Sequence, residues 1–204
     1  IPFINNLPTE YSVYNQIGFH YQDIPYQINT NLLLTGHYQS DKFFKNNKQY
    51  ICDLFRPTSE IKQLIKSNWL DTTNLVSIHV RRGDYLQYPK HHPQQTIDYY
   101  KSAAEIIGLD REYIIFSDDI HGCTEIFNFL PNKQFFTTRI DWIDLYMMSL
   151  CSDNIICNSS FSWWGAYFNS NNEKVVCYPK DWFGPNMKHL KLDDMYPDTW
   201  NKMK

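Results

Sequence analysis

A short basic stretch holds the residue types in this chain that could do chemistry. It follows an apolar run rich in Val and Ile, and its chemically active members are His79, Arg81, Arg82, Gly83 and Asp84. Guanidinium groups offer a rigid fork of donors to a phosphate, and a glycine lets the backbone come close to a bound anion. The stretch therefore predicts an anion site. A surface turn with a local Arg–Asp pair is the alternative interpretation.

A second loop is rich in small hydroxyl residues, at a point where a strand is expected to join a helix. Its polar members are Asn158, Ser159, Ser160 and Ser162. Free N–H groups and the positive end of the helix dipole at such a helix start suit a phosphate. Ordinary capping of the helix by Ser159 or Ser160 is the alternative interpretation.

A third loop is acidic and contains Ser117, Asp118 and Asp119. Two adjacent carboxylates on a loop do not face one another well, and no His, Cys or carboxylate cluster with metal-ligand spacing accompanies them, so we predict no metal site. A carboxylate accepts hydrogen bonds from N–H and O–H groups, which fits a nucleobase or a ribose. A solvated turn after a strand remains the alternative.

The three loops belong to a regular alternation of strands and helices in the second part of the chain. Strands are expected at residues 75–80, 113–116, 134–136, 154–157 and 174–178, and helices at residues 96–107, 124–130, 141–150 and 161–168. This alternation predicts an α/β fold with a doubly wound parallel sheet. Ligands bind beyond the carboxyl ends of the strands in such a sheet, so the three loops are expected to meet at one edge.

The first part of the chain has no comparable pattern. Residues 1–73 are rich in Tyr, Asn, Gln and Pro, with a short strand expected at 32–34, a short helix at 41–44 and a longer helix at 58–69. We therefore predict two domains, 1–73 and 74–204, the first not self-sufficient. The numbering opens on Ile1 and not on Met, and we expect further residues upstream.

Composition excludes several classes of protein. The formal net charge is −3, so no general nucleic-acid binder is indicated. The five cysteines are widely spaced and form no C-x-x-C pair, so we expect reduced core thiols. With no visible signal peptide and no apolar run of membrane-spanning length, we expect a cytoplasmic protein.

Two anion-suited loops and an acidic loop on one sheet edge suit a diphosphate that carries a base. A nucleoside-diphosphate sugar fits that description. Neither the phosphate loop of P-loop NTPases nor the G-x-G-x-x-G turn of dinucleotide oxidoreductases is present.

The same stretches resemble successive motifs of the α-1,2-fucosyltransferases, glycosyltransferase family 11. The matching segments are 79–85 (HVRRGDY), 116–119 (FSDD), 158–164 (NSSFSWW) and 36–40 (GHYQS), the last resembling a G-Y-x-Q-S segment. The basic strand end alone is shared with α-1,6- and protein O-fucosyltransferases, whereas four motifs in the same order are specific. The resemblance runs from about residue 34 to residue 164.

The resemblance implies a GT-B-like fold of two Rossmann-type halves, with 1–73 as an incomplete acceptor-side half and 74–204 as the donor-binding half. It implies GDP-β-L-fucose as donor, a galactosyl hydroxyl of a glycan as acceptor, inversion at the anomeric carbon, and no metal or other cofactor. Arg81 would be the catalytic residue that holds the pyrophosphate and neutralises the leaving GDP. The implied substrate-binding residues are His79, Arg82, Asp84, Ser117, Asp118, Asn158, Ser159, Ser160 and Ser162.

Within that set, the resemblance implies separate roles. His79 and Asp118 would lie near guanine and ribose, and Ser160 and Ser162 near the phosphates, while Arg82 and Asp84 would brace the loop. The chain lacks the glycine-rich G-G-L-G-N-Q turn with which family members begin. A non-catalytic nucleotide- or carbohydrate-binding remnant therefore stays open as an alternative. A transferase for another GDP-deoxyhexose is a second alternative, because the sequence does not identify the sugar pocket.

Overall fold

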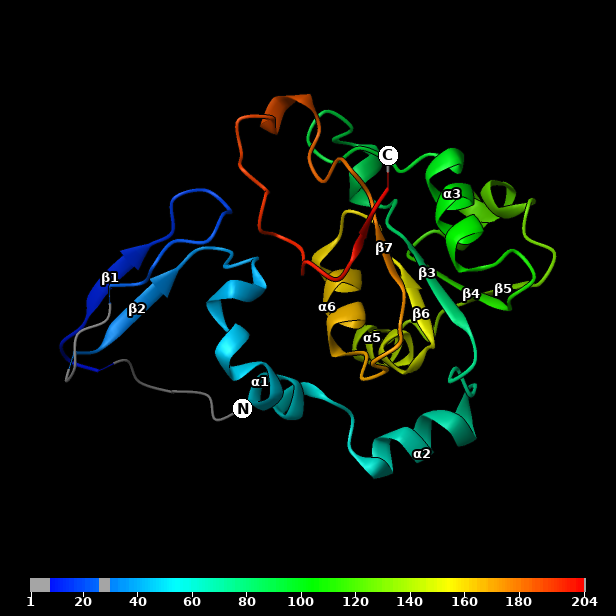
Figure 1. The fold of residues 1–204 in the computed structure, drawn as a ribbon, viewed down its shortest axis with the longest axis horizontal. Coiled ribbons are helices and arrows are strands. Elements are labelled where there is room, and N and C mark those ends of the chain that lie inside the picture. The colour runs from blue at the N-terminus through cyan, green and yellow to red at the C-terminus, as the bar shows by residue number, and fades with distance from the viewer. Residues whose placement is uncertain (1–7, 26–29, 204) are drawn as a thin grey trace. The chain divides into compact units, whose positions relative to one another are not determined.

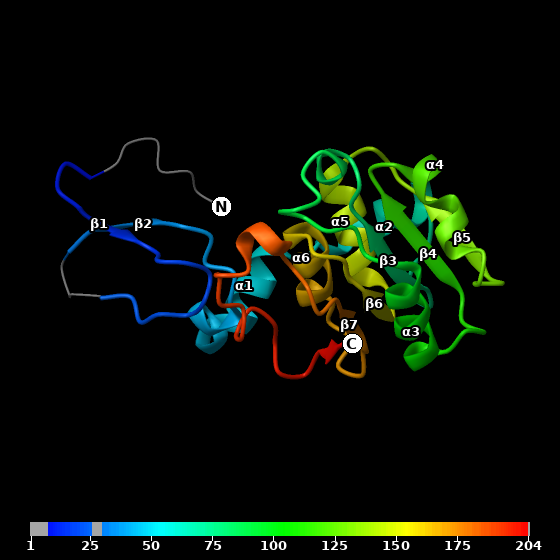
Figure 2. The same ribbon diagram turned by 90° about the horizontal axis from the view of Figure 1, so that it is seen from above.

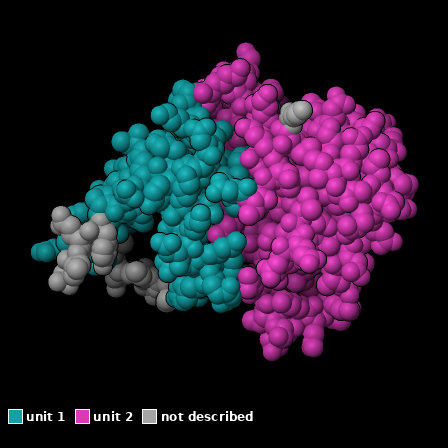
Figure 3. Space-filling model, in the orientation of Figure 1, with its two compact units in different colours: residues 1–55, 189–198 teal, residues 56–188, 199–204 magenta. Residues whose placement is uncertain are grey.

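The computed structural model describes residues 8–25 and 30–203 and divides the chain into two compact units. The smaller unit comprises residues 1–55 and 189–198, and the larger comprises residues 56–188 and 199–204 (Figure 3). The domain boundary predicted at residue 73 concerns the acceptor and donor sides of a whole enzyme, and it stays a prediction.

The larger unit is built on a six-stranded sheet in which every neighbouring pair is parallel (Figures 1 and 2). Its strands are β3 (Val76–Val80), β4 (Tyr113–Ser117), β5 (Lys133–Phe136), β6 (Asp153–Ile155), β7 (Val176–Tyr178) and β8 (Asn201–Lys202). Their spatial order is β5-β4-β3-β6-β7-β8. The chain thus winds outward from β3 in one direction and then returns to wind from β6 in the other, which is the doubly wound order with its switch point between β3 and β6.

Alternate residues of the central strands point to two hydrophobic layers, as strand geometry requires. Ile78 and Ile115 belong to a core layer with α3 (Ile97–Ile107) and the helical segment α4–η4 (Ile120–Cys123 and Thr124–Phe127). Ile114 and Phe116 belong to a layer on the opposite face with α2 (Ser59–Asn68) and α5 (Asp141–Leu150), and α6 (Ser160–Phe168) packs against α5. Helices therefore cover both faces of the sheet, as predicted.

Local sequence accounts for the ends of the best-defined helix. The hydroxyl of Thr96 accepts a hydrogen bond from the N–H of Tyr99 and caps the start of α3. Gly108 ends the helix with φ of 123°, a conformation that disfavours a side chain. In the same way Thr58 caps α2 by accepting from the N–H of Ile61.

The smaller unit has a two-stranded parallel sheet, β1 (Ser12–Asn15) with β2 (Leu32–Thr35), the 3₁₀ helices η1 (Asp41–Phe43) and η2 (Lys45–Asn47), and helix α1 (Lys48–Phe55). Asp194 fastens residues 189–198 to this unit. Its carboxylate accepts from the N–H of Tyr21 at 2.8 Å, and its carbonyl accepts from the Ser40 hydroxyl at 2.7 Å.

In the larger unit one predicted helix was misplaced and one strand was not predicted. The helix expected at 124–130 begins at Ile120, because the Asp119 carboxylate accepts from the N–H of Gly122 and caps it, and it continues as a 3₁₀ turn only to Phe127. The final stretch, for which no element was predicted, supplies strand β8; both of its residues are exposed, so no apolar pattern marks it.

The cysteine prediction is confirmed. All five cysteines are free and buried: Cys52, Cys123, Cys151, Cys157 and Cys177. Among the described residues, no helix has the length and apolar character needed to cross a bilayer.

Candidate functional site

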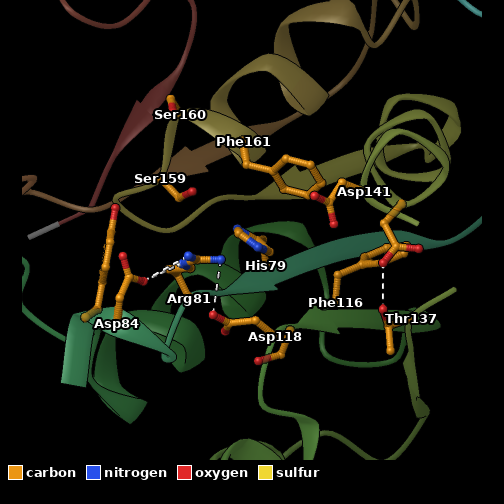
Figure 4. A pocket seen from close by; sticks show the side chains of 13 residues that line it. His79, Arg81, Asp84, Phe116, Asp118, Thr137, Asp141, Ser159, Ser160 and Phe161 are labelled. Carbon is orange, nitrogen blue, oxygen red and sulfur yellow. Dashed lines mark hydrogen bonds and ion pairs between the residues drawn. The ribbon is translucent and has the colours of Figure 1, made fainter. Parts of the chain in front are cut away.

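A pocket of about 370 Å³ opens at the carboxyl ends of the strands around the switch point (Figure 4). Side chains at the ends of β3 and β4, and from the loops and helix starts that follow β3, β4, β5 and β6, line it. They are His79, Arg81, Asp84, Tyr85, Phe116, Ser117, Asp118, Thr137, Asp141, Asp144, Ser159, Ser160 and Phe161. Seven of the ten predicted site residues are therefore brought together, although they come from three separate loops.

Arg81 carries the fixed positive charge of the pocket. Its Nε and Nη2 donate to Oδ1 of Asp84 at 3.1 and 2.9 Å, and its Nη1 lies 3.1 Å from Oδ2 of Asp118. Partial burial lowers the pKa of the guanidinium, but Asp118 and Asp84 outweigh that effect and the pKa lies above its ordinary value. The local Arg–Asp pair therefore exists, and the charged guanidinium that it holds lines the pocket.

The acidic loop holds the basic loop in shape. Oδ1 of Asp118 accepts from the backbone N–H of Arg82 at 2.9 Å, and Oδ2 of Asp119 pairs with Nε of Arg82 at 2.9 Å. Hydrogen bonding from the N–H of Gly122 and then from Arg82 lowers the pKa of Asp119. Each of the two carboxylates thus forms an ion pair with an arginine, Asp118 with Arg81 and Asp119 with Arg82. The described residues contain no group of three or more His, Cys, Asp or Glu side chains able to hold a metal ion.

His79 lines the pocket as a neutral base. Only 5% of the residue is exposed, and burial, helped by the charge of Arg81, lowers its pKa to about 3. The ring of Phe161 lies beside it with the two centroids 5.4 Å apart. At any pH near 7 the imidazole therefore has one N–H donor and one bare nitrogen.

The serine loop enters α6 without a side-chain cap. Ser159 occupies the N-cap position, but its hydroxyl makes no capping hydrogen bond, so the capping interpretation of this loop was wrong. The backbone N–H groups in the first turn of a helix have no partner within the helix. Ser159 and Ser160 both line the pocket, so this helix start faces Arg81 across it.

Three predicted site residues do not line the pocket: Arg82, Asn158 and Ser162. Arg82 pairs with Asp119 as described. The Asn158 amide is buried and ties loops together, donating to the carbonyls of Pro93 and Trp182 at 3.1 and 3.0 Å and accepting from Gln95 at 2.9 Å. Ser162 is buried and donates to the Ser159 carbonyl at 3.2 Å.

Sequence reasoning missed several pocket residues, of which Asp141 and Asp144 are the most polar. They stand three residues apart on α5, so they share a helix face, and that spacing was the available signal. Asp144 accepts from the Thr137 hydroxyl at 2.7 Å and from the N–H and hydroxyl of Thr138 at 2.9 and 2.7 Å. Asp141 is exposed and also lines a second depression that shares Ser117, Asp118 and Thr137 with the pocket.

Sequence comparison identifies the family. The model described as glycosyl transferase family 11 matches residues 4–204. This chain belongs to glycosyl transferase family 11. The resemblance noted from the motifs is thereby confirmed at the level of the family, and three of the four motif segments, 79–85, 116–119 and 158–164, contribute residues to the pocket.

Three relatives show the range of the similarity. An O-antigen biosynthesis glycosyltransferase of Escherichia coli, WbnK, is 31% identical over 183 residues, which cover 82% of this chain and 61% of the relative. An alpha-1,2-colitosyltransferase of Escherichia coli is 31% identical over 178 residues, covering 81% and 60%. A putative galactoside 2-alpha-L-fucosyltransferase of Caenorhabditis elegans is 26% identical over 196 residues, covering 85% and 53%. This family 11 chain thus spans about three fifths of the length of the first two relatives.

Proposed function

We propose that this chain forms the donor-binding part of an inverting, metal-independent glycosyltransferase of GT-B-like architecture. It moves L-fucose from GDP-β-L-fucose to a galactosyl or similar hydroxyl of a glycan and makes an α-1,2 linkage. Besides the donor it needs no cofactor. The five free cysteines support residence in a reducing compartment, the cytoplasm.

One observation carries the proposal: the Arg81 guanidinium and the uncapped start of α6 line the same pocket at the sheet's switch point. A pyrophosphate needs donors on more than one side, and this arrangement supplies a charged fork on one side and backbone N–H groups on the other. The polar wall of Thr137, Asp141 and Asp144 extends the pocket beyond the anion and offers acceptors for ribose and base.

The chemistry follows from that placement. The acceptor hydroxyl attacks the anomeric carbon on the face opposite GDP, a new C–O bond forms, and the bond from the anomeric carbon to the phosphate oxygen breaks. The proton of the hydroxyl passes to a general base and from there to solvent. GDP leaves with the electron pair of that bond, so negative charge grows on the phosphate where Arg81 and the helix N–H groups would lie. Preorganised donors of this kind lower the barrier because they need no reorganisation as the charge develops.

The name of one relative suggests a second candidate for the donor sugar nucleotide. The alpha-1,2-colitosyltransferase is 31% identical to this chain, and colitose differs from fucose by the loss of a single hydroxyl group. GDP-colitose is therefore the specific form of the alternative in which the sugar, and not the nucleotide, differs. A non-catalytic nucleotide-binding remnant is the remaining alternative, since the chain spans only part of its relatives.

Calorimetric titration tests the proposal. GDP, GDP-fucose and GDP-colitose are titrated into the protein beside UDP as a control. We expect GDP and one GDP-sugar to bind and UDP to bind at least tenfold more weakly. Equal affinity for GDP and UDP, or no binding of either, would overturn the donor assignment. Release of GDP on addition of lactose would separate the enzyme from the remnant.

A further inference from the structure

His79 has a buried neighbour that the donor site by itself does not explain. The Sγ atom of Cys157 lies 3.2 Å from Nδ1 of His79, and only 1% of Cys157 is exposed. The two residues stand 78 positions apart in the chain. They meet because β3 and β6 pair in parallel with Ile78 opposite Ile155, which brings His79, near the carboxyl end of β3, beside Cys157, which lies just beyond β6.

Both groups are neutral, so the contact is a hydrogen bond and not an ion pair. Burial raises the pKa of the Cys157 thiol to about 12, so the sulfur keeps its proton. Burial and the charge of Arg81 lower the pKa of His79 to about 3, so the ring carries a proton on one nitrogen only. Either the thiol or Nδ1–H can donate in this contact, depending on the tautomer of the ring.

The surroundings of the Cys157 sulfur indicate that the thiol is the donor. If Nδ1 carried the proton, the sulfur would accept from it, and the thiol proton would be left with Oγ of Ser162 as its side-chain acceptor, at 3.9 Å instead of 3.2 Å. Ser162 already donates its own proton to the Ser159 carbonyl. An imidazole nitrogen is also a stronger acceptor than a thiol sulfur, which is a weak one. The short contact is therefore S–H to Nδ1.

The outer nitrogen of the ring then has a defined role. His79 lines the pocket, and no described residue is hydrogen-bonded to its Nε2 (Figure 4). A bare Nδ1 that accepts from a thiol leaves the single ring proton on Nε2. The Phe161 ring, 5.4 Å away between centroids, restricts the plane of the imidazole.

We propose that Cys157 is a positioning residue: its thiol donates to Nδ1 of His79, holds the ring as the Nε2–H tautomer and so presents that N–H to an acceptor oxygen of the nucleotide. The identity of the ligand rests on the proposed function. The tautomer itself does not, because the groups that fix it belong to the protein.

Nitrogen NMR of histidine-labelled protein tests the tautomer without any ligand. Correlations between ring carbon-bound protons and both ring nitrogens report which nitrogen is protonated, and His79→Asn assigns the signals. We expect His79 protonated at Nε2 in the wild type and in Cys157→Ser, whose hydroxyl still donates. We expect a mixture of tautomers in Cys157→Ala, and no change in Cys177→Ala, a matched buried cysteine whose sulfur lies 4.0 Å from the Ala103 carbonyl.

Protonation at Nδ1 in the wild type, or a tautomer unchanged in Cys157→Ala, would overturn the proposal. The wild-type spectrum decides the donor even if Cys157→Ala does not fold, and Cys157→Val, which fills more of the space and also has no donor, then supplies the comparison.

Titration with GDP measures whether the Cys157 thiol contributes to nucleotide affinity. We expect binding about fivefold weaker in Cys157→Ala, the factor for one ordinary neutral hydrogen bond, and within twofold of wild type in Cys157→Ser. Weakening in both variants alike would contradict the donor role of the thiol. Absence of GDP binding in the wild type, with Nε2 still protonated, would overturn the proposed function and leave the tautomer assignment in place.

Discussion

At the scale of single residues, the central feature is an arginine held between two carboxylates before any anion binds. Asp84 and Asp118 each contact a different edge of the Arg81 guanidinium, so its direction is set in advance. Charge-assisted contacts of this kind are directional, and a planar fork loses little freedom when it binds. The positive charge that would meet the leaving phosphate is therefore preorganised.

Replacing that arginine should remove most of the charge stabilisation. We expect Arg81→Ala to reduce transfer roughly a hundredfold, about 3 kcal/mol in activation free energy, and to weaken GDP binding as well. Arg81→Lys keeps the charge without the fork and should recover only part of the rate. Arg111→Ala is the matched control, because Arg111 pairs with Asp153 and does not line the pocket. Unchanged affinity and rate in Arg81→Ala would contradict the assignment.

The neutral histidine makes a prediction about acid stability. The pKa of His79 is about 3 in the folded protein and near 6.5 when the chain is unfolded. Between those values the unfolded chain binds the additional proton, so this group's contribution is complete above pH 6.5 and falls as the pH is lowered. At pH 5 the loss amounts to about 2 kcal/mol.

Urea unfolding of the wild type and of His79→Asn, each at pH 7 and pH 5, measures this contribution. The wild type should lose more stability than the variant between the two values. Burial also lowers the pKa of His92, which acts in the same direction in both proteins and cancels in the comparison. An equal loss in both proteins would show that His79 is not buried as a neutral base.

At the scale of elements, the loop after β3 is shaped by how closely Asp118 passes it. A Cβ added at Gly83 would lie 2.5 Å from Oδ2 of Asp118, the same oxygen that contacts Arg81. We expect Gly83→Ala to displace that carboxylate and weaken GDP binding about tenfold, the scale of one charge-assisted hydrogen bond.

The control for that variant is Gly108→Ala. Gly108 has φ of 123° at the end of α3, so an alanine there is strained and should lower stability, but it should leave GDP affinity unchanged. If Gly83→Ala binds GDP as tightly as the wild type does, then Asp118 does not orient Arg81.

Asn158 joins the loops at another point. Its buried amide makes three hydrogen bonds, to the Pro93 and Trp182 carbonyls and from Gln95. We expect Asn158→Ala to cost about 2–3 kcal/mol of unfolding free energy, because buried polar partners lose their hydrogen bonds. Urea unfolding measures the cost, and hydrogen exchange should quicken over residues 84–95. Asn132→Ala removes one exposed hydrogen bond to the Asp110 carbonyl and should cost under about 1 kcal/mol.

At the scale of the whole molecule, the burial of the five cysteines makes their reactivity a measure of how rarely the core opens to solvent. All are buried and free, and burial raises the pKa of Cys151, Cys157 and Cys177 to about 12. Thiolate is the reactive form, so both access and ionisation oppose reaction.

We expect the native protein to react slowly with Ellman's reagent and all five thiols to react once urea unfolds it. Ser170→Cys, at an exposed position after α6, should react rapidly in the folded protein and calibrate the assay. Fast reaction of a native thiol would show that part of the core opens readily.

Much of the larger unit was predictable because its signals are local. Threonine caps, a terminating glycine and apolar runs located α2, α3, β3 and β4 within a residue or two. The polar residues after each strand predicted where a site would form, since parallel strands bring their carboxyl ends to one edge. The helix at α4 was misplaced because its cap, Asp119, was assigned to ligand binding.

The sequence by itself determined the alternation of elements, the loops that carry polar groups and the family, because periodicity, capping and motif order depend on neighbouring residues. Only the tertiary structure decided which side chains face the pocket. The Asn158 amide bonds to neighbouring loops and not to the pocket, whereas Asp144 lines the pocket from α5. Cys157 contacts His79, 78 residues away in the chain. Those outcomes depend on sheet register and on competition for hydrogen-bond partners across the fold, and neither is encoded at any single stretch of the chain.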